Sequence, residues 1–201
     1  MYRRPKETTM ADVLLLHHVQ GLTPGMEAFA STLRDAGHTV HAPDLFDGRT
    51  FTTIDDGMAH AREVGFGELA GRGVAAADDL GSAPVFIGFS LGVMAAQQLA
   101  QTRADARGAV LVDACAPVSE FSDGWPEDVP VQVHGMGNDP FFAAGGDLDA
   151  ARELVATTED AELFLYDGDV HLFADASLDV HDPEAADLLV RRVLAFLDEL
   201  D

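Results

Sequence analysis

Short apolar runs alternate with longer amphipathic stretches along most of this chain. The runs are bounded by turn-forming residues and predict buried strands. These predicted strands cover residues 11–16, 39–42, 84–89, 108–112, 130–134 and 162–166. Between them, apolar positions that recur at intervals of three and four predict helices that begin at Pro24 and near residues 57, 91, 147 and 183.

Capping residues mark several helix ends. Thr23 followed by Pro24 predicts the start of the first helix, and Gly37 predicts its end. Asp182 followed by Pro183 predicts the start of the last helix in the same way. The inward face of the first helix is predicted to carry Met26, Phe29, Ala30 and Leu33.

Strands that alternate with helices predict a parallel α/β sheet with helices on both faces, of the doubly wound kind. We expect about six strands in a single domain over residues 11–201, preceded by a flexible tail at residues 1–10. Residues 43–56 are predicted to form a loop, and the helix over residues 57–80 is predicted to break at its glycines. Because ligands in such folds bind beyond the carboxyl ends of the strands, the residues that follow each strand are the candidates for chemistry.

The composition narrows the class of protein. With 201 residues, 47% of them hydrophobic, the chain is long enough to bury a full core. Its single cysteine, Cys115, allows no internal disulfide and is expected to be a buried core residue. We expect a cytoplasmic protein, because the N-terminal segment lacks the apolar stretch of a signal peptide and no apolar run is long enough to span a bilayer.

The net charge excludes two classes of partner. Asp and Glu number 35 against 12 Lys and Arg, which gives a formal net charge of −23. A strongly negative surface repels nucleic acid and anionic membranes, so we expect neither as a partner. The acidity is compatible with adaptation to high salt or with a general compositional bias, and it identifies no substrate.

The segment from Gly88 to Gly92, Gly-Phe-Ser-Leu-Gly, lies between a predicted strand and a predicted helix. A serine at such a sharp turn adopts a strained backbone conformation and projects its hydroxyl above the sheet. The glycines are needed because a Cβ at either position would collide with the neighbouring strand or helix. Ser90 is therefore the candidate nucleophile, and the Leu91 N–H that follows it is a candidate oxyanion donor.

Two further residues follow strands in the order that a catalytic triad requires. Asp139 comes after the strand at 130–134, and His171 comes after the strand at 162–166. A serine hydroxyl is a weak nucleophile, so it needs an imidazole to take its proton and a carboxylate to orient that imidazole. Each residue could also be an ordinary loop residue, and Asp113, at the end of the strand at 108–112, could serve as the acid instead.

The loop after the first strand is expected to supply the second oxyanion donor, from the backbone of Val19 or, alternatively, of Gln20. His17 and His18 are not expected to bind one metal ion together, because adjacent residues in an extended segment point in opposite directions. Loop residues beyond the strand ends could line the substrate pocket or, for several aromatic ones, pack against the core. The candidate pocket residues are His18, Gln20, Phe46, Arg49, Trp125, Phe141, Phe142 and Phe173.

Several motifs together resemble the dienelactone hydrolase family of α/β-hydrolases, from about residue 11 to residue 200. They lie at residues 16–22, 42–46, 88–92, 134–141 and 166–171. The resemblance implies a triad of Ser90, Asp139 and His171 and an oxyanion hole formed by the backbone of Leu91 and Val19.

The chain departs from the family's founding members at three positions. Those members carry cysteine where this chain has Ser90, glutamate where it has His18, and a carboxylate-binding arginine where it has Asp175. We therefore expect a cofactor-independent and metal-independent serine hydrolase of a small ester or lactone, acting as a monomer or small homo-oligomer. The alternatives are a non-catalytic ligand-binding protein on a hydrolase scaffold and a thioesterase or amidase.

Overall fold

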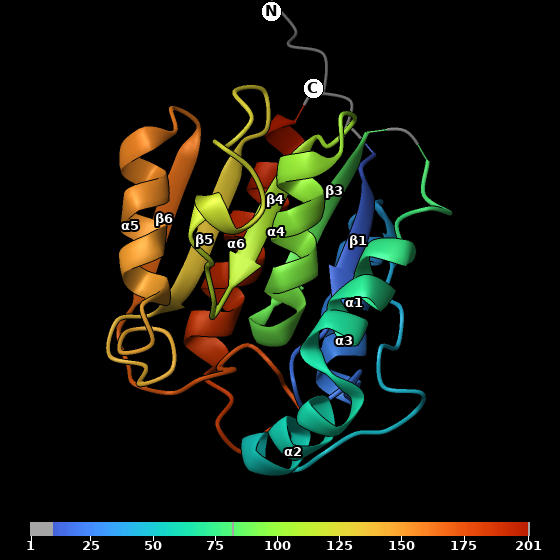
Figure 1. Ribbon diagram of the computed structural model, residues 1–201. Helices are drawn as coiled ribbons and strands as arrows, with labels where there is room; N and C mark the ends of the chain where they lie inside the picture. The colour runs from blue at the N-terminus through green and yellow to red at the C-terminus, as the bar shows by residue number, and fades with distance from the viewer. Residues whose placement is uncertain (1–9, 82, 201) are drawn as a thin grey trace, which may run out of the picture.

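Six parallel strands form one sheet in the computed structural model, which describes residues 10–81 and 83–200 (Figure 1). The strand order is β2-β1-β3-β4-β5-β6, and every neighbouring pair is parallel. The strands are β1 (Asp12–Leu16), β2 (Thr39–His41), β3 (Pro84–Phe89), β4 (Gly108–Val112), β5 (Val131–Met136) and β6 (Ala161–Tyr166). The chain winds first to one side of β1 and then to the other, as expected of a doubly wound sheet.

Helices cover both faces of the sheet. They are α1 (Pro24–Asp35), α2 (Ile54–Val64), α3 (Phe66–Ala75), α4 (Val93–Thr102), α5 (Asp147–Thr157) and α6 (Pro183–Glu199). Buried residues of α1 and α6 pack in one core cluster, and those of α3, α4 and α5 pack in a second cluster on the other face. Alternate residues of the central strands β1, β3 and β4 enter the two clusters, so these three strands are apolar on both sides. The strands β2, β5 and β6 also carry polar residues, among them His41, Gln132 and Glu162.

The local signals for helix starts are confirmed at both ends of the chain. Thr23 accepts a hydrogen bond from the Met26 N–H at the start of α1, and Asp182 caps α6 by accepting from two backbone N–H groups. The predicted inward residues of α1 are all buried. The predicted helix over residues 57–80 does break at a glycine, because Gly65, at φ 99°, separates α2 from α3.

The prediction of a loop over residues 43–56 places the end of the loop too far along the chain. Helix α2 already begins at Ile54, because Thr53 adopts an extended conformation and its hydroxyl accepts the Asp56 N–H. The spacing Thr53-x-x-Asp56 resembles a capping box, a signal for an earlier start that the hydrophobic periodicity alone does not give.

The carboxyl ends of all six strands lie at one edge of the sheet, at the bottom of Figure 1. The loops after β1, β3, β4, β5 and β6 therefore meet at this edge. Of the predicted tail, Met10 is exposed and residues 1–9 lie outside the described residues. None of the described helices is long and apolar enough to cross a membrane.

Candidate active site

Ser90 occupies a strained turn between β3 and the short helix η1 (Ser90–Gly92). Its φ angle is 47°, in the left-handed region that a residue with a Cβ rarely adopts. A Cβ on Gly88 would lie 2.7 Å from the backbone of Val93, and one on Gly92 would overlap the Leu16 carbonyl oxygen. The two glycines therefore let the turn pack directly against the neighbouring strand and helix, and the Ser90 side chain stays partly exposed.

A continuous chain of hydrogen bonds joins Ser90, His171 and Asp139. Ser90 Oγ lies 2.9 Å from His171 Nε2, and His171 Nδ1 lies 2.6 Å from Asp139 Oδ2. Asp139 is completely buried, and its other oxygen accepts the Phe141 N–H at 2.9 Å. Because a carboxylate can only accept, Nδ1 carries the proton that faces Asp139, which leaves Nε2 free to accept from the Ser90 hydroxyl.

The surroundings of His171 favour its protonated form. Burial alone would lower the pKa of His171, but the hydrogen bond to Asp139 and the negative charges of Asp113, Asp139 and Asp147 outweigh burial and raise it. The imidazolium that forms when His171 takes a proton is therefore stabilised by its neighbours.

Asp113 lies beside this chain of hydrogen bonds without being part of it. Its Oδ2 accepts the Leu172 N–H at 3.1 Å, and one side-chain atom each of Asp113, Asp139 and His171 lie within 4.8 Å of one another. Burial raises the pKa of Asp113 to about 7, and Asp113 Oδ1 has no hydrogen-bond partner among the described residues. Of the two acids that the sequence leaves open, the structure places Asp139 on His171 Nδ1 and Asp113 on the backbone next to His171.

The two expected backbone donors lie at the start of η1 and just after β1. The Leu91 N–H belongs to the first turn of η1, where backbone N–H groups have no partner within the helix. The Val19 N–H donates to no acceptor in the described part of the chain, whereas the alternative donor, the Gln20 N–H, already bonds to His18 Nδ1 at 3.2 Å. The observed bonding favours Val19 over Gln20 as the free donor.

A cavity of about 420 Å³ adjoins His171. Gln20 and Phe141, two of the predicted pocket residues, line it, and the Phe141 ring centre lies 4.9 Å from that of His171. The lining also includes two threonines and a proline, four aliphatic residues and three exposed carboxylates. These are Thr52, Thr53 and Pro140; Ile54, Val170, Leu178 and Val180; and Asp55, Asp169 and Asp179. Among the described residues, no arginine or lysine lines the cavity.

The other predicted pocket residues lie elsewhere, so these assignments are corrected. Phe142 and Phe173 are completely buried in the two core clusters, because the loops after β5 and β6 fold back onto the sheet. Phe46 packs edge-on against His17 beneath the loop after β2 and, with Arg49, borders a different cavity. Trp125 donates a hydrogen bond from Nε1 to the Val129 carbonyl in the connection from β4 to β5.

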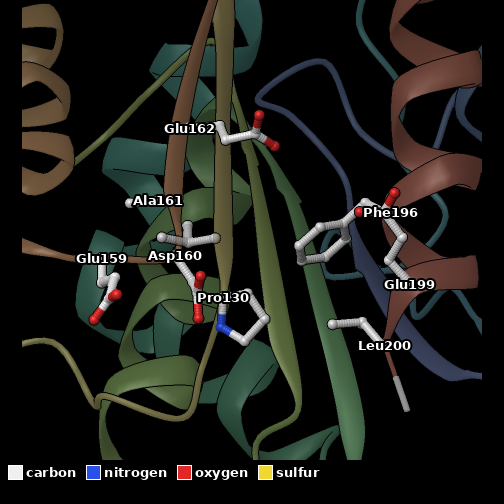
Figure 2. Close-up of a pocket in the computed structure, with 9 residues that line it drawn as sticks. Pro130, Glu159, Asp160, Ala161, Glu162, Phe196, Glu199 and Leu200 are labelled. Atoms are coloured by element: carbon white, nitrogen blue, oxygen red, sulfur yellow. The ribbon is translucent and has the colours of Figure 1, made fainter.

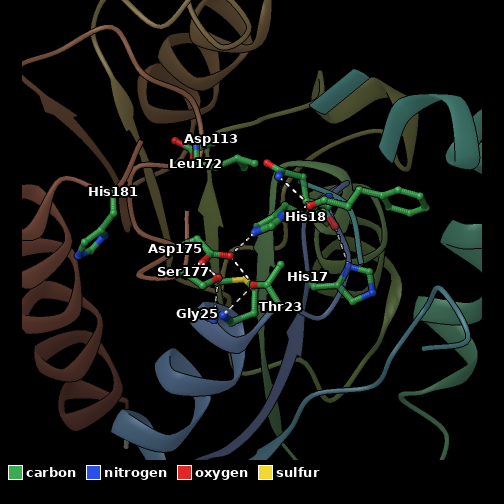
Figure 3. A network of polar contacts seen from close by, with 12 residues as sticks. His17, His18, Thr23, Gly25, Asp113, Leu172, Asp175, Ser177 and His181 are labelled. Atoms are coloured by element: carbon green, nitrogen blue, oxygen red, sulfur yellow. Dashed lines mark hydrogen bonds and ion pairs between the residues drawn. The ribbon is translucent and has the colours of Figure 1, made fainter. Parts of the chain in front are cut away.

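His18 is also buried rather than exposed in the pocket. Its Nε2 donates to Asp175 Oδ2 at 2.8 Å, whereas His17 Nδ1 donates to the His18 carbonyl and His17 Nε2 accepts the Leu45 N–H. The two rings point in different directions, as their adjacent positions predict (Figure 3). Local sequence signals miss both the His18–Asp175 contact and the apolar cavity residues, because no helical or strand periodicity covers residues 169–181.

A second cavity, of about 500 Å³, lies at the opposite edge of the sheet, where β5 and β6 begin (Figure 2). Its walls are acidic or apolar and include Glu159, Glu162, Phe196 and Leu200. No serine, cysteine or histidine within residues 10–81 and 83–200 lines it. The other cavity is lined by His171, whose Nε2 lies 2.9 Å from Ser90 Oγ, and it is therefore the candidate reaction site.

A family model described as the dienelactone hydrolase family matches residues 1–200. The chain belongs to the dienelactone hydrolase family. Membership in this family makes the protein a hydrolase of carboxylic esters, which agrees with the expected class of enzyme. A comparison with the curated proteins finds no match.

Solved structures share the fold at low sequence identity. A candidate dienelactone hydrolase from Klebsiella pneumoniae is 19% identical, with a TM-score of 0.72, and the match covers 98% of this chain and 90% of that one. A dienelactone hydrolase-like promiscuous phosphotriesterase from metagenomic libraries is 20% identical, with a TM-score of 0.68 over 97% and 88% of the two chains. The monoacylglycerol lipase of Paleococcus ferrophilus is 16% identical, with a TM-score of 0.67 over 96% and 97%.

Proposed function

We propose that this dienelactone hydrolase family member is a serine hydrolase that cleaves a small, uncharged ester or lactone through an acyl-enzyme. The observation that carries the proposal is the unbroken series of hydrogen bonds from Ser90 Oγ through both nitrogens of His171 to Asp139. The alternative of a non-catalytic binding protein gives no reason to keep a serine strained at φ 47° within hydrogen-bonding distance of a buried imidazole.

In the first step, Ser90 Oγ bonds to the carbonyl carbon while its proton passes to His171 Nε2. The carbonyl oxygen becomes an oxyanion, which the Leu91 and Val19 N–H groups bind. Asp139 keeps Nδ1 protonated and stabilises the imidazolium, so Nε2 is the nitrogen that exchanges the proton.

The tetrahedral intermediate then collapses and the bond from the carbonyl carbon to the leaving oxygen breaks. His171 Nε2 returns its proton to the leaving alkoxide, which in a lactone stays attached to the acyl group. Water next attacks the acyl-enzyme, with His171 as base, and the second collapse releases the acid and restores Ser90.

The cavity argues for uncharged substrates. Asp55, Asp169 and Asp179 lie around it, and the described part of the chain adds no arginine or lysine to the lining, so a substrate carboxylate would enter a field of its own sign. The position where the family's founding members bind that carboxylate is Asp175 here, which is buried and bonded to His18. We expect a neutral short-chain ester to have a higher kcat/KM than dienelactone, and the reverse order would contradict this assignment.

Covalent labelling tests the nucleophile and the alternatives together. A fluorophosphonate should label the wild-type protein at Ser90, and Ser90→Ala should lose labelling and lower ester turnover by at least about 10³-fold. Retention of activity within tenfold of wild type in Ser90→Ala would refute the nucleophile. A wild-type protein that neither labels nor hydrolyses esters would favour the binding-protein alternative, and matched ester, thioester and amide substrates separate the enzymatic alternatives.

A further inference from the structure

Asp175 is the centre of a buried polar network next to the candidate active site (Figure 3). Its side chain is 1% exposed and accepts hydrogen bonds from His18 Nε2 at 2.8 Å, from the Ser177 N–H at 2.8 Å and hydroxyl at 2.6 Å, and from the Thr23 hydroxyl. Gly25 lies so close that a Cβ there would overlap Asp175 Oδ1. A buried carboxylate with this many donors is fully satisfied and fixed in one orientation.

Only one tautomer of the His18 ring suits its two partners. Nδ1 lies 3.2 Å from the Gln20 backbone N–H, which can only donate, so Nδ1 must accept. Nε2 faces the Asp175 carboxylate, which can only accept, so Nε2 must donate. The ring is completely buried, and both of its nitrogens are engaged.

These contacts decide which backbone N–H of the loop after β1 stays free. The His18 side chain takes up the Gln20 N–H, and the His18 carbonyl takes up the Gly21 N–H at 3.0 Å. The N–H of Val19, between them, is left without an acceptor in the described part of the chain.

The same carboxylate also connects this loop to the loop that carries His171. Asp175 lies four residues after His171, and its own N–H donates to the Leu172 carbonyl at 3.1 Å. The contact with His18 bridges 157 residues of sequence. The base and the loop after β1 are thus fixed to one another through a single buried side chain.

We propose that Asp175, acting through His18, is a positioning residue that keeps the Val19 N–H free and aimed at the oxyanion. This inference rests on the proposed function, because it assigns a role within the ester-cleaving reaction. Neither Asp175 nor His18 contacts the reacting atoms in this role. Their effect is on the free energy of the transition state, through the orientation of one backbone dipole.

Two substitutions at His18 each remove one of the two hydrogen bonds that the ring makes, to Asp175 and to the Gln20 N–H. His18→Asn retains an acceptor at the position of Nδ1 but loses the contact with Asp175, whereas His18→Gln retains a donor to Asp175 but loses the acceptor for the Gln20 N–H. We expect each to lower the acylation rate on p-nitrophenyl acetate by about 10- to 100-fold, below the full loss of an oxyanion donor. Asp175→Asn, which loses one acceptor oxygen, should fall in the same range.

A transition-state analogue separates positioning from general damage. A trifluoromethyl ketone adds to the serine and places a negative oxygen where the ester oxyanion forms, so its inhibition constant should rise in proportion to the loss of acylation rate. His134→Asn and His134→Gln are matched controls, because His134 is also fully buried and hydrogen-bonded through both nitrogens, to Tyr166 and Gln132. They should lower the melting temperature while leaving acylation and ketone binding within about twofold of wild type.

The outcomes distinguish the two proposals. An active wild type whose His18 and Asp175 variants acylate within twofold of it would overturn the positioning role alone. Slower acylation with unchanged ketone binding would also overturn it, because the loss would then lie outside the oxyanion hole. A wild type that neither cleaves the ester nor binds the ketone would refute the proposed function itself. If the His18 variants do not fold, Asp175→Asn gives the same comparison.

Discussion

Two buried histidine–carboxylate pairs lie at the same edge of the sheet, and they differ in what the second ring nitrogen contacts. In the His171–Asp139 pair, Nε2 faces the hydroxyl of Ser90, which is partly exposed. In the His18–Asp175 pair, Nδ1 faces the backbone N–H of Gln20. The carboxylate contacts are similar, at 2.6 Å and 2.8 Å.

The difference determines what each imidazole can do. A hydroxyl can give up its proton to the ring, so His171 can change its charge during a reaction. A backbone N–H cannot, so His18 Nδ1 remains a hydrogen-bond acceptor and has no proton to exchange with its partner. A histidine–carboxylate pair is therefore a candidate for proton transfer only when its other nitrogen faces an exchangeable proton near a cavity, and otherwise it is a structural connection.

The carboxylates of the two pairs should differ most in their effect on turnover. Asp139→Asn should lower kcat by about 10⁴-fold, because the amide favours the wrong tautomer of His171. Asp175→Asn should cost about 10- to 100-fold, since it disturbs only the orientation of one donor. Steady-state kinetics of the purified variants on one ester measures both. If Asp113→Asn proves more damaging than Asp139→Asn, the acid is Asp113, directly after β4, and the assignment of the pair is wrong.

The effect of the neighbouring carboxylates on the pKa of His171 should be measurable in the pH dependence of kcat/KM. A base must be neutral, and its raised pKa places the acid limb of the kcat/KM profile above pH 6.5, the ordinary value for histidine. Since the pKa of Asp113 is itself about 7, its charge develops over the same pH range as the limb. Asp113→Asn removes this partly developed charge, so the limb should move to lower pH by a modest amount, with a modest change in the plateau. Profiles of wild type and variant over pH 5–9 test this, and a limb that stays in place or moves to higher pH would show that the Asp113 charge does not act on His171.

Sequence patterns predict most of the elements and the sharp turn that carries Ser90, because their causes are local. The Gly88-to-Gly92 turn, the caps at Thr23 and Asp182, and the apolar runs of the strands each depend on residues a few positions apart. Because all six strands are parallel, their carboxyl ends lie at one edge of the sheet. Ser90, Asp139 and His171 each follow a strand, so they lie at this edge.

The surroundings of the triad are harder to predict, because they depend on how loops fold back onto the sheet. Phe142 and Phe173 follow strands just as Phe141 does, yet only Phe141 remains exposed beside His171. The contact between His18 and Asp175 joins the two ends of the chain and has no local signature. Phe46 likewise packs inward because His17 and His60 provide an aromatic surface that only the folded loop creates.

Acid unfolding should report on the second pair. Burial alone would raise the pKa of Asp175, but hydrogen bonds from His18, Ser177 and Thr23 outweigh burial and lower it to about 2. Because the folded-state pKa lies below that of the unfolded chain, near 3.9, the carboxylate contributes stability at pH values above about 4, and this contribution is lost as the pH falls toward 2. The shift corresponds to roughly 2 to 3 kcal/mol.

The free energies of unfolding of wild type and Asp175→Asn, measured in urea at several pH values, isolate this contribution from that of the other carboxylates. The difference between the two proteins should be largest near pH 7 and should shrink as the pH falls from about 4 toward 2. Asp179→Asn, at an exposed position in the same loop, is the control and should change the unfolding free energy little at any of these pH values. A difference for Asp175→Asn that stays constant or grows on acidification would mean that the folded protein does not favour the ionised carboxylate, and the fixed tautomer of His18 would lose its physical basis.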